Sequence, residues 1–267
     1  MRKRLGTEES LAGMRDQVYK DPRPAAQFAR FHQRARTREP DWVYGVVRVL
    51  TTLYGAIAFR ARAVRPDRVP ASGPVILAPN HFSFMDHFFV GMFTRRQVRF
   101  MAKSQLFRRP MQFVYSHGGV FPVRRGHNDE EAFITARSIL ARGGCVVMYC
   151  EGGRSRTGKL ADSVKPGVGR LALESGATVV PVAISGSQRV RNWKRLRFSE
   201  VTVHYGDPLR FGSAGEPTRD RQQKVADEIF SAVRQLYAGL DDPHLQLRKR
   251  VGKGVVRSLA GARNRAA

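Results

Sequence analysis

The chain has 267 residues, and its 47 Lys and Arg residues outnumber its 22 Asp and Glu residues, for a formal net charge of +25. This length can bury a full core, so we expect one catalytic domain with terminal extensions. The charge predicts an anionic partner, whether a nucleic acid, an anionic membrane surface or a phosphorylated substrate. Cys145 and Cys150 lie on one predicted strand, roughly 16 Å apart between Cα atoms, which excludes a disulfide between them and fits a reducing compartment.

The first 40 residues are charged, and Pro22, Pro24 and Pro40 interrupt any helix there. We therefore expect residues 1–40 to form a basic arm that is partly disordered or adheres to a surface. The N-terminus has no apolar run of the kind found in a secretory signal peptide, so none is expected.

Residues 42–59 are the strongest candidate for contact with a membrane, at about 27 Å as a helix. One helical face holds polar and small residues: Asp41, Tyr44, Arg48, Thr51, Thr52 and Gly55. The other face is apolar: Trp42, Val43, Val46, Val49, Leu50, Leu53 and Ile57. Because Arg48 at mid-span would be costly in hydrocarbon, we expect segment 41–64 to be an amphipathic helix lying in the membrane interface, with Arg60 and Arg62 at anionic headgroups. The alternative is an ordinary amphipathic helix packed on the domain.

Strand and helix patterns alternate through residues 65–240. Strands are expected at 74–78, 98–101, 120–123, 145–150, 178–184 and 200–205, and helices at 84–93, 105–115, 129–141, 167–174 and 219–240. This alternation predicts an α/β domain with a largely parallel sheet flanked by helices. The basic tail, 241–267, is expected to be a loose arm.

A polar turn, residues 80–86, follows the first predicted strand. Ser83 stands at a helix cap position with Asp86 three residues later, which is the spacing of a capping box. Such a turn folds the Asp86 carboxylate back toward the His81 imidazole, whereas one continuous helix would point the two side chains about 140° apart. A histidine held by a carboxylate is a general base. The alternative is a capping aspartate beside an unrelated histidine.

Charged residues also follow three later strands. Lys103, Arg124 with Arg125, and Glu151 with Arg154 all stand at predicted strand ends. Ligands of open α/β sheets gather at the carboxyl ends of strands. Arginine holds phosphate with paired donors, so a base beside these cations predicts a hydroxyl nucleophile on a phosphorylated molecule.

Residues 153–159 match the GxxxxGK pattern of a nucleotide-binding loop. Leu160 stands where Ser or Thr should hold magnesium, and Glu151 would bring negative charge to the phosphates. The helical pattern also resumes only after Pro166, so no helix N-terminus follows the loop directly. We therefore do not favour a nucleotide site.

Four stretches in series resemble the signature blocks of the glycerolipid acyltransferases, the family that includes enzymes acylating lysophosphatidic acid. Residues 80–86 (NHFSFMD) resemble the NHxxxxD block, 118–124 (GGVFPVR) the second, 151–155 (EGGRS) the EGTRS block, and 180–184 (VPVAI) the fourth, proline-bearing strand. Their order and spacing agree over about residues 70–210. Gly153 replaces the usual Thr, and Pro122 takes a place often held by Ile or Val.

The resemblance implies an acyltransferase domain over residues 65–240, with His81 and Asp86 as catalytic residues. It implies substrate contacts by Lys103, Phe121, Arg124, Glu151, Gly152, Arg154, Ser155 and Pro181. Ser83 is interpreted as a cap and His87 as a bystander. No metal or other cofactor is expected, since no Cys/His cluster or carboxylate set has ligand spacing.

By the same resemblance, the expected reaction moves a fatty acyl group from acyl-CoA or acyl-carrier protein to a lysophospholipid. The acceptor expected is 1-acylglycerol 3-phosphate, giving phosphatidic acid, at the cytoplasmic face of the cell membrane with the protein peripheral or monotopic. Alternatives are another acceptor, such as glycerol 3-phosphate or a different lysolipid, and a non-catalytic basic module that binds membranes or nucleic acid. Nucleic acid is not the expected partner, because no motif of nucleic-acid modules is present.

Overall fold

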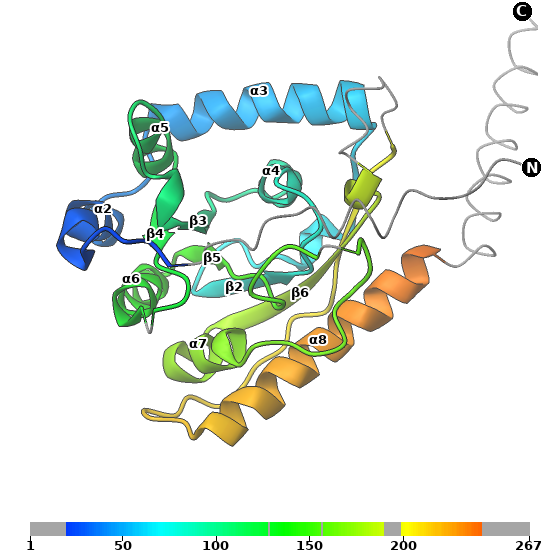
Figure 1. Ribbon diagram of the computed structural model, residues 1–267. Coiled ribbons are helices and arrows are strands. Elements are labelled where there is room, and N and C mark those ends of the chain that lie inside the picture. The colour runs from blue at the N-terminus through cyan, green and yellow to red at the C-terminus, as the bar shows by residue number, and fades with distance from the viewer. Residues whose placement is uncertain (1–19, 128, 156, 190–198, 242–267) are drawn as a thin grey trace, which may run out of the picture.

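The computed structural model describes residues 20–127, 129–155, 157–189 and 199–241, which form one seven-stranded sheet flanked by helices (Figure 1). The strands are β1 Arg62–Val64, β2 Val75–Pro79, β3 Arg99–Lys103, β4 Val120–Val123, β5 Cys145–Val147, β6 Thr178–Ser185 and β7 Thr202–Tyr205. The α-helices are α2 Ala29–Thr37, α3 Trp42–Phe59, α4 Asp86–Met92, α5 Met111–His117, α6 Glu130–Ala141, α7 Gly167–Ser175 and α8 Arg219–Asp241, and the short 3-10 helices are η1 Ala25–Phe28, η2 Pro66–Arg68 and η3 Ser104–Leu106.

The strand order is β1-β7-β6-β2-β5-β3-β4. Within the described residues β6 and β7 pair antiparallel and the other neighbours pair parallel. The carboxyl ends of β2, β5, β3 and β4 are therefore adjacent along one edge of the sheet. The predicted α/β fold with a largely parallel sheet is confirmed.

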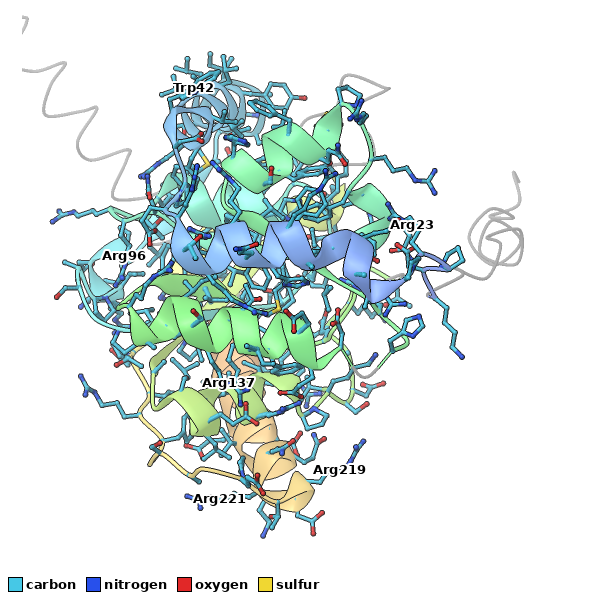
Figure 2. All side chains as sticks on the ribbon, turned by 90° about the vertical axis from the view of Figure 1, so that its left-hand side faces the viewer. Arg23, Trp42, Arg96, Arg137, Arg219 and Arg221 are labelled. Atoms are coloured by element: carbon cyan, nitrogen blue, oxygen red, sulfur yellow. The ribbon has the colours of Figure 1, made fainter. Side chains whose placement is uncertain are left out.

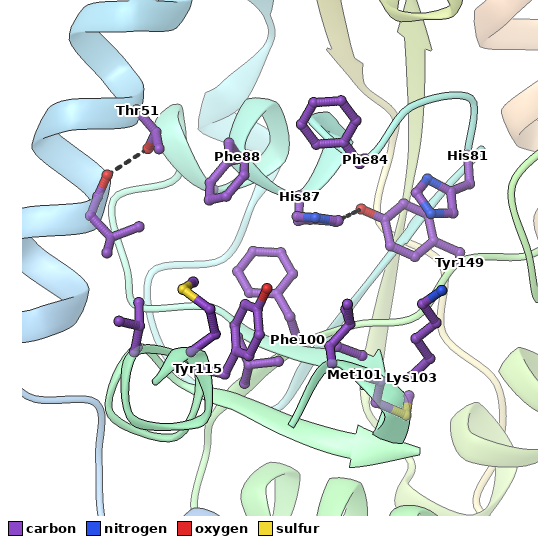
Figure 3. Close-up of a pocket in the computed structure, with 18 of the residues that line it drawn as sticks. Thr51, His81, Phe84, His87, Phe88, Phe100, Met101, Lys103, Tyr115 and Tyr149 are labelled. Atoms are coloured by element: carbon purple, nitrogen blue, oxygen red, sulfur yellow. Dashed lines mark hydrogen bonds between the residues drawn. The ribbon is translucent and has the colours of Figure 1, made fainter. Parts of the chain in front are cut away.

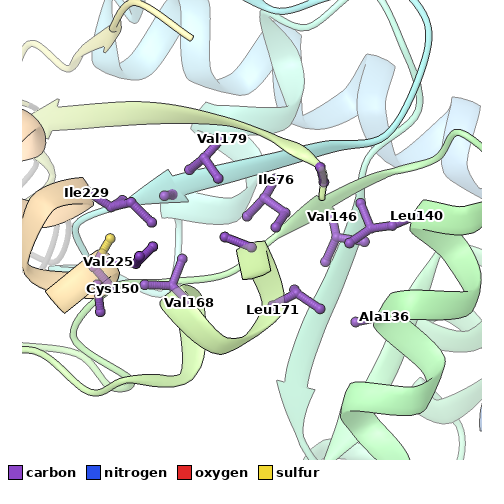
Figure 4. Packing of buried hydrophobic residues seen from close by; sticks show 14 of the residues in the cluster. Ile76, Ala136, Leu140, Val146, Cys150, Val168, Leu171, Val179, Val225 and Ile229 are labelled. Atoms are coloured by element: carbon purple, nitrogen blue, oxygen red, sulfur yellow. The ribbon is translucent and has the colours of Figure 1, made fainter. Parts of the chain in front are cut away.

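The sheet separates two apolar layers. Helices α6, α7 and α8 cover one face, and α4 covers the other, with α3 and α5 on the same side as α4 (Figure 1). Alternation along β2 sends Ile76 and Ala78 into the first layer and Val75 and Leu77 into the second. The first layer holds Ile76, Ala136, Leu140, Val146, Val168, Leu171, Val179, Val225 and Ile229 (Figure 4).

Several element boundaries differ from the sequence expectation. Helix α4 begins at Asp86 rather than at 84, because the Asp86 carboxylate accepts the amides of Phe82 and Ser83 and holds the chain in a turn. The helix expected at 105–115 is divided into η3 and α5 around Pro110, which has no amide proton. Strand β1 was not expected, because three residues are too few to show the alternation of apolar and polar side chains that indicates a strand.

Residues 20–40 are the described part of the segment that was expected to be a partly disordered or surface-adhering basic arm, and they form helices instead. This part contains η1 and α2, which pack on the domain with Phe28, Phe31, His32 and Ala35 buried. Burial of an aromatic side chain stabilises by roughly 1.5–3 kcal/mol, which outweighs the unfavourable local composition. Residues 1–19 and the tail from 242 lie outside the described residues.

Helix α3 matches the apolar run 42–59 and is capped by the Asp41 side chain, which accepts the amide of Val43. The expected helical segment, 41–64, was too long, because residues 62–64 form β1. The polar face of α3 points inward, where Tyr44 and Gly55 are buried and Arg48 donates to the carbonyl of Thr94. Val43, expected on the apolar face, is also buried. The remaining apolar face points away from the domain, with Trp42 71% and Ile57 79% exposed. Figure 2 shows Trp42 at the end of the molecule opposite Arg219 and Arg221 of α8.

Candidate active site

Asn80 and His81 directly follow β2 and are fixed by backbone contacts on both sides. The Asn80 side-chain amide donates to the carbonyl of Ile184 at 3.0 Å and accepts from its amide at 2.7 Å, which ties the turn to β6. The carbonyl of His81 accepts from the amide of Ser155 at 2.8 Å. The turn is therefore held between β6 and the loop that follows β5.

The carboxylate of Asp86 folds back onto this turn as the sequence predicted. Its Oδ2 lies 2.8 Å from His81 Nδ1 and accepts the amides of Phe82 and Ser83, each at 2.7 Å. Ser83 Oγ accepts the amide of Met85 at 3.2 Å and so stabilises the turn. The His81–Asp86 contact is confirmed, whereas the assignment of Ser83 as the helix cap is wrong, because α4 begins at Asp86 and its cap residue is Met85.

The tautomer of His81 follows from these contacts. Because Asp86 Oδ2 accepts two amides, it is an acceptor for the imidazole as well, and Nδ1 carries the proton. Nε2 is then left with its lone pair. Burial lowers the pKa of His81, while the hydrogen bond that His81 donates to Asp86 opposes that shift, so the neutral imidazole is favoured around neutral pH.

Tyr149 and His87 complete the surroundings of the imidazole. The Tyr149 ring stacks on His81 with ring centroids 3.9 Å apart and planes 20° apart. The Tyr149 hydroxyl lies 3.4 Å from His87 Nδ1, as Figure 3 shows. Burial raises the pKa of Tyr149 well above its ordinary value and lowers the pKa of His87 to about 4. Both side chains are therefore neutral at physiological pH.

Glu151 supports the site from the loop after β5. Its carboxylate accepts the amide of His81 at 3.3 Å and the amide of Ala161 at 3.2 Å. Burial raises the pKa of Glu151 to about 7. The next residue, Gly152, has φ +64°, a left-handed backbone conformation that favours glycine.

A cavity of about 650 Å³ opens beside His81, between α3, α4, α5 and β3 (Figure 3). His81, Lys103 and Tyr149 lie toward one end of the view, and Thr51 of α3 lies toward the other. Aromatic and apolar side chains line the space between them, including Phe88, Phe100, Met101, Val114 and Tyr115. Among the described lining residues four are cationic, Arg48, Lys103, Arg125 and Arg154, and none is acidic. The cavity therefore suits a ligand with an apolar chain and an anionic group.

The structure brings most of the predicted site residues together. His81, Lys103, Arg154 and Ser155 line this cavity, and Asp86, Glu151 and Gly152 lie directly behind its wall. Glu151 was expected to hold Arg154 or a substrate hydroxyl, and it holds two backbone amides instead.

Three predicted substrate contacts do not reach the cavity. Arg124 turns away and donates to the carbonyl of Arg23 at 3.1 Å, and the next residue, Arg125, lines the cavity in its place. Phe121 is completely buried among the residues of the α6 layer. Pro181 alternates with Val180 and Val182, which face the α4 layer, so it lies on the opposite face of β6. Since the cavity lies on the α4 side, these residues are corrected from substrate contacts to structural ones.

Arg48, His87 and Tyr149 also line the cavity and were not identified as site residues from the sequence, and Arg125 was named there only as a cation at a strand end. His87 was interpreted as a bystander, and it lines the cavity. The sequence held a signal for Tyr149, because it stands two residues after Val147, on the α4 face, and two residues before Glu151. Within the described residues no group of three or more His, Cys, Asp and Glu side chains has a geometry that could hold a metal ion.

Comparison with known proteins agrees with this site. The model of the family described as Acyltransferase matches residues 60–185, which include β1 to β6 and the His81–Asp86 turn. This match covers just under half of the chain and, with the similar proteins described next, supports a glycerolipid acyltransferase family. The sequence resemblance makes His81 and Asp86 the expected catalytic pair, and His81 lines the cavity just described.

Two proteins similar to this chain are from plants. The chain is 25% identical over 170 residues to the chloroplastic 1-acyl-sn-glycerol-3-phosphate acyltransferase LPAT1 of Arabidopsis thaliana, covering 61% of this chain and 47% of the relative. It is 23% identical over 164 residues to a 1-acyl-sn-glycerol-3-phosphate acyltransferase of Cocos nucifera, covering 59% and 51%. The chain thus spans about half the length of these curated relatives.

The fold is similar to the crystal structure of the 1-acyl-sn-glycerophosphate (LPA) acyltransferase PlsC from Thermotoga maritima. The TM-score is 0.57 with 20% sequence identity, and the match covers 81% of this chain and 90% of that chain. This structural similarity covers a larger share of the chain than the family match does.

Proposed function

We propose that this acyltransferase moves an acyl group from a thioester donor to the free hydroxyl of 1-acylglycerol 3-phosphate, giving phosphatidic acid. The observation that carries the proposal is the His81–Asp86 pair beside a cavity with four cations and no acidic lining residue among those described. The names of the plant relatives and of the PlsC neighbour support this acceptor.

The proposed reaction uses His81 as the base. Nε2 takes the proton of the acceptor hydroxyl as its oxygen attacks the thioester carbonyl carbon, and Asp86 stabilises the imidazolium through Nδ1. The tetrahedral intermediate collapses as the C–S bond breaks, and the thiolate leaves and takes the proton from the imidazolium. The products are an ester and a free thiol. General base catalysis of this kind contributes about 10²–10⁴-fold.

Arg125 and Arg154 are proposed to hold the phosphate of the acceptor, with Lys103 as a helper. All three line the cavity. They lie at or after the carboxyl ends of β3, β4 and β5, along the same edge of the sheet as His81 after β2. Guanidinium groups bind phosphate with paired, charge-assisted hydrogen bonds. The donor is proposed to be acyl-CoA or acyl-carrier protein, without another cofactor, and its acyl chain to occupy the apolar part of the cavity.

The outward face of α3 is proposed to lie in the interface of the cell membrane, on the cytoplasmic side, as a peripheral or monotopic attachment. Helix α3 is long and apolar enough to span a bilayer by length and composition, and 22% of it is buried. Spanning would carry Arg48 into hydrocarbon and break its contact with Thr94. Further exposed apolar side chains near the cavity favour the interfacial arrangement: Phe84, Leu106, Met111 and Phe113.

A panel of acceptors tests the proposal. The purified protein is mixed with vesicles and radiolabelled palmitoyl-CoA, and with 1-acylglycerol 3-phosphate, glycerol 3-phosphate, lysophosphatidylcholine or monoacylglycerol. We expect 1-acylglycerol 3-phosphate to be acylated fastest and monoacylglycerol, which lacks the phosphate, at least about tenfold more slowly. Equal rates for these two acceptors would contradict the role of the cations, and no ester product with any acceptor would contradict the activity.

A further inference from the structure

Tyr149 occupies a place beside His81 that the reaction described so far does not use. Its ring covers one face of the imidazole at 3.9 Å, and its hydroxyl is within 3.4 Å of His87 Nδ1. Figure 3 shows Tyr149 between the labelled rings of His81 and His87, facing the same cavity. The three side chains come from two different segments, the loop after β5 and the turn that begins α4.

The contact with Asp86 fixes only one point of the imidazole. The hydrogen bond at Nδ1 sets the distance and the tautomer of His81, yet the ring can still tilt about that bond. A flat ring stacked at 20° limits this tilt, because any large rotation brings the two rings into overlap. The Tyr149 hydroxyl in turn is tied to His87, which is built into α4 directly after Asp86. The two contacts together define the plane of the imidazole.

We propose that Tyr149 is a positioning residue for His81, and that its tie to His87 holds Tyr149 in place. Misplacing a reacting group by about 1 Å can cost roughly 10²-fold in rate, so a modest gain in precision is sufficient to explain the arrangement. The inference rests on the proposed acyl transfer and names a further residue of the same site.

Tyr149 also keeps water from one face of the imidazole. Burial is the main cause of the lowered pKa of His81. The charged and titratable groups around His81 come from the turn, from the end of β4 and from the loop after β5: Asp86, His87, Arg125, Tyr149, Glu151 and Arg154. Removing the Tyr149 ring leaves the charged groups of this set in place and admits water. The pKa of His81 should then rise toward its ordinary value.

The test compares Tyr149→Met, which fills similar volume without a flat face, with Tyr149→Phe, which keeps the ring. For Tyr149→Met we expect kcat to fall about tenfold, with KM for acceptor and donor within threefold. The acid limb of the kcat/KM profile should move to higher pH by about half a unit. Tyr149→Phe should keep the wild-type limb, with kcat only a few-fold below that of the wild type because the contact with His87 is lost. Tyr149→Leu serves as a second variant if Tyr149→Met does not fold.

A double-mutant cycle tests the tie to His87. His87→Leu should lower kcat a few-fold in the wild type and have no further effect in Tyr149→Phe, because the hydroxyl is already absent. A Tyr149→Met enzyme with kcat within twofold of wild type, or with an unmoved acid limb, would overturn the inference. A Tyr149→Phe enzyme as slow as Tyr149→Met would also overturn it. These results differ from failure of the proposed function, in which the wild type makes no ester or His81→Ala remains active.

Discussion

Two histidine–aspartate pairs in this chain have the same local chemistry and different surroundings. His81 Nδ1 lies 2.8 Å from Asp86 Oδ2, and His117 Nδ1 lies 2.5 Å from Asp41 Oδ2. The side chains of the first pair are 7% and 0% exposed, and those of the second are 25% and 31% exposed. Only the first pair includes a residue that lines the cavity.

The second pair joins three helices at the surface. Asp41 caps α3 and accepts from Arg34 of α2 at 2.7 Å, while His117 ends α5 and stacks on Phe113. The Asp41 carboxylate thus accepts hydrogen bonds from a helix N-terminus and an arginine in addition to His117. The Asp86 carboxylate accepts hydrogen bonds from two amides of its own turn and from His81. A histidine beside an aspartate therefore does not define a catalytic site. The cavity, its cations and the buried, oriented imidazole do.

The largest expected effect separates the two histidines. His81→Ala should lower the rate of acyl transfer by about 10³-fold or more, since it removes the base, whereas His117→Ala should keep it within threefold. Both variants should remain folded by circular dichroism. Steady-state turnover of 1-acylglycerol 3-phosphate measures the difference, and comparable losses in the two variants would mean that the pairs are not functionally distinct.

The next largest effect is expected when a cationic residue of the cavity is replaced. Arg125→Met or Arg154→Met should raise KM for 1-acylglycerol 3-phosphate about 10–100-fold, because a charge-assisted hydrogen bond contributes about 1.5–3 kcal/mol. Arg124→Met is the matched control, since this side chain contacts Arg23, and its KM should stay within threefold. If Arg124→Met weakens the acceptor as much as Arg125→Met does, the assignment of the two arginines is wrong.

The proposed membrane contact of the outward face of α3 can be tested by a binding assay that does not depend on acyl transfer. Leu50→Glu or Ile57→Glu should lower binding to anionic vesicles about tenfold, because side chains that are 62% and 79% exposed would no longer enter the interface. Ser231→Glu adds the same charge to an exposed position on α8 and should have little effect. Co-sedimentation measures the bound fraction, and equal losses for all three would point to net charge alone.

The pH profile should show a base with a lowered pKa. Neutral His81 is required, and protonation removes it as pH falls through a value below the ordinary 6.5. The acid limb of kcat/KM should therefore have its midpoint below pH 6.5, and more than half of the maximum should remain at that pH. A midpoint above pH 7 would indicate a different titrating group.

The smallest effect on activity is expected from Asp41. Asp41→Ala removes the cap of α3 and its contacts with Arg34 and His117, and should lower the free energy of unfolding by about 1–2 kcal/mol. The turnover of the folded fraction should remain within threefold of wild type. Denaturant unfolding and activity on the same sample check both statements, and a tenfold loss of turnover would connect this pair to catalysis.

The parts of the site that depend on neighbouring residues could be predicted from the sequence. The contact between His81 and Asp86 arises within a seven-residue turn after a buried strand, so cap spacing and strand pattern were sufficient. The choice between Arg124 and Arg125 could not be predicted, because it depends on where β4 ends and on the carbonyl of Arg23 brought by the N-terminal segment. The packing of α2 was missed for the same reason, since its partners lie far along the chain.

The most direct measurement of the central claim is a crystal structure with 1-acylglycerol 3-phosphate and a non-hydrolysable thioether analogue of palmitoyl-CoA. We predict the acceptor hydroxyl oxygen within hydrogen-bond distance of His81 Nε2, about 2.6–3.2 Å, with the phosphate between Arg125 and Arg154. A hydroxyl bound away from the imidazole, or a phosphate bound outside this cavity, would contradict the account.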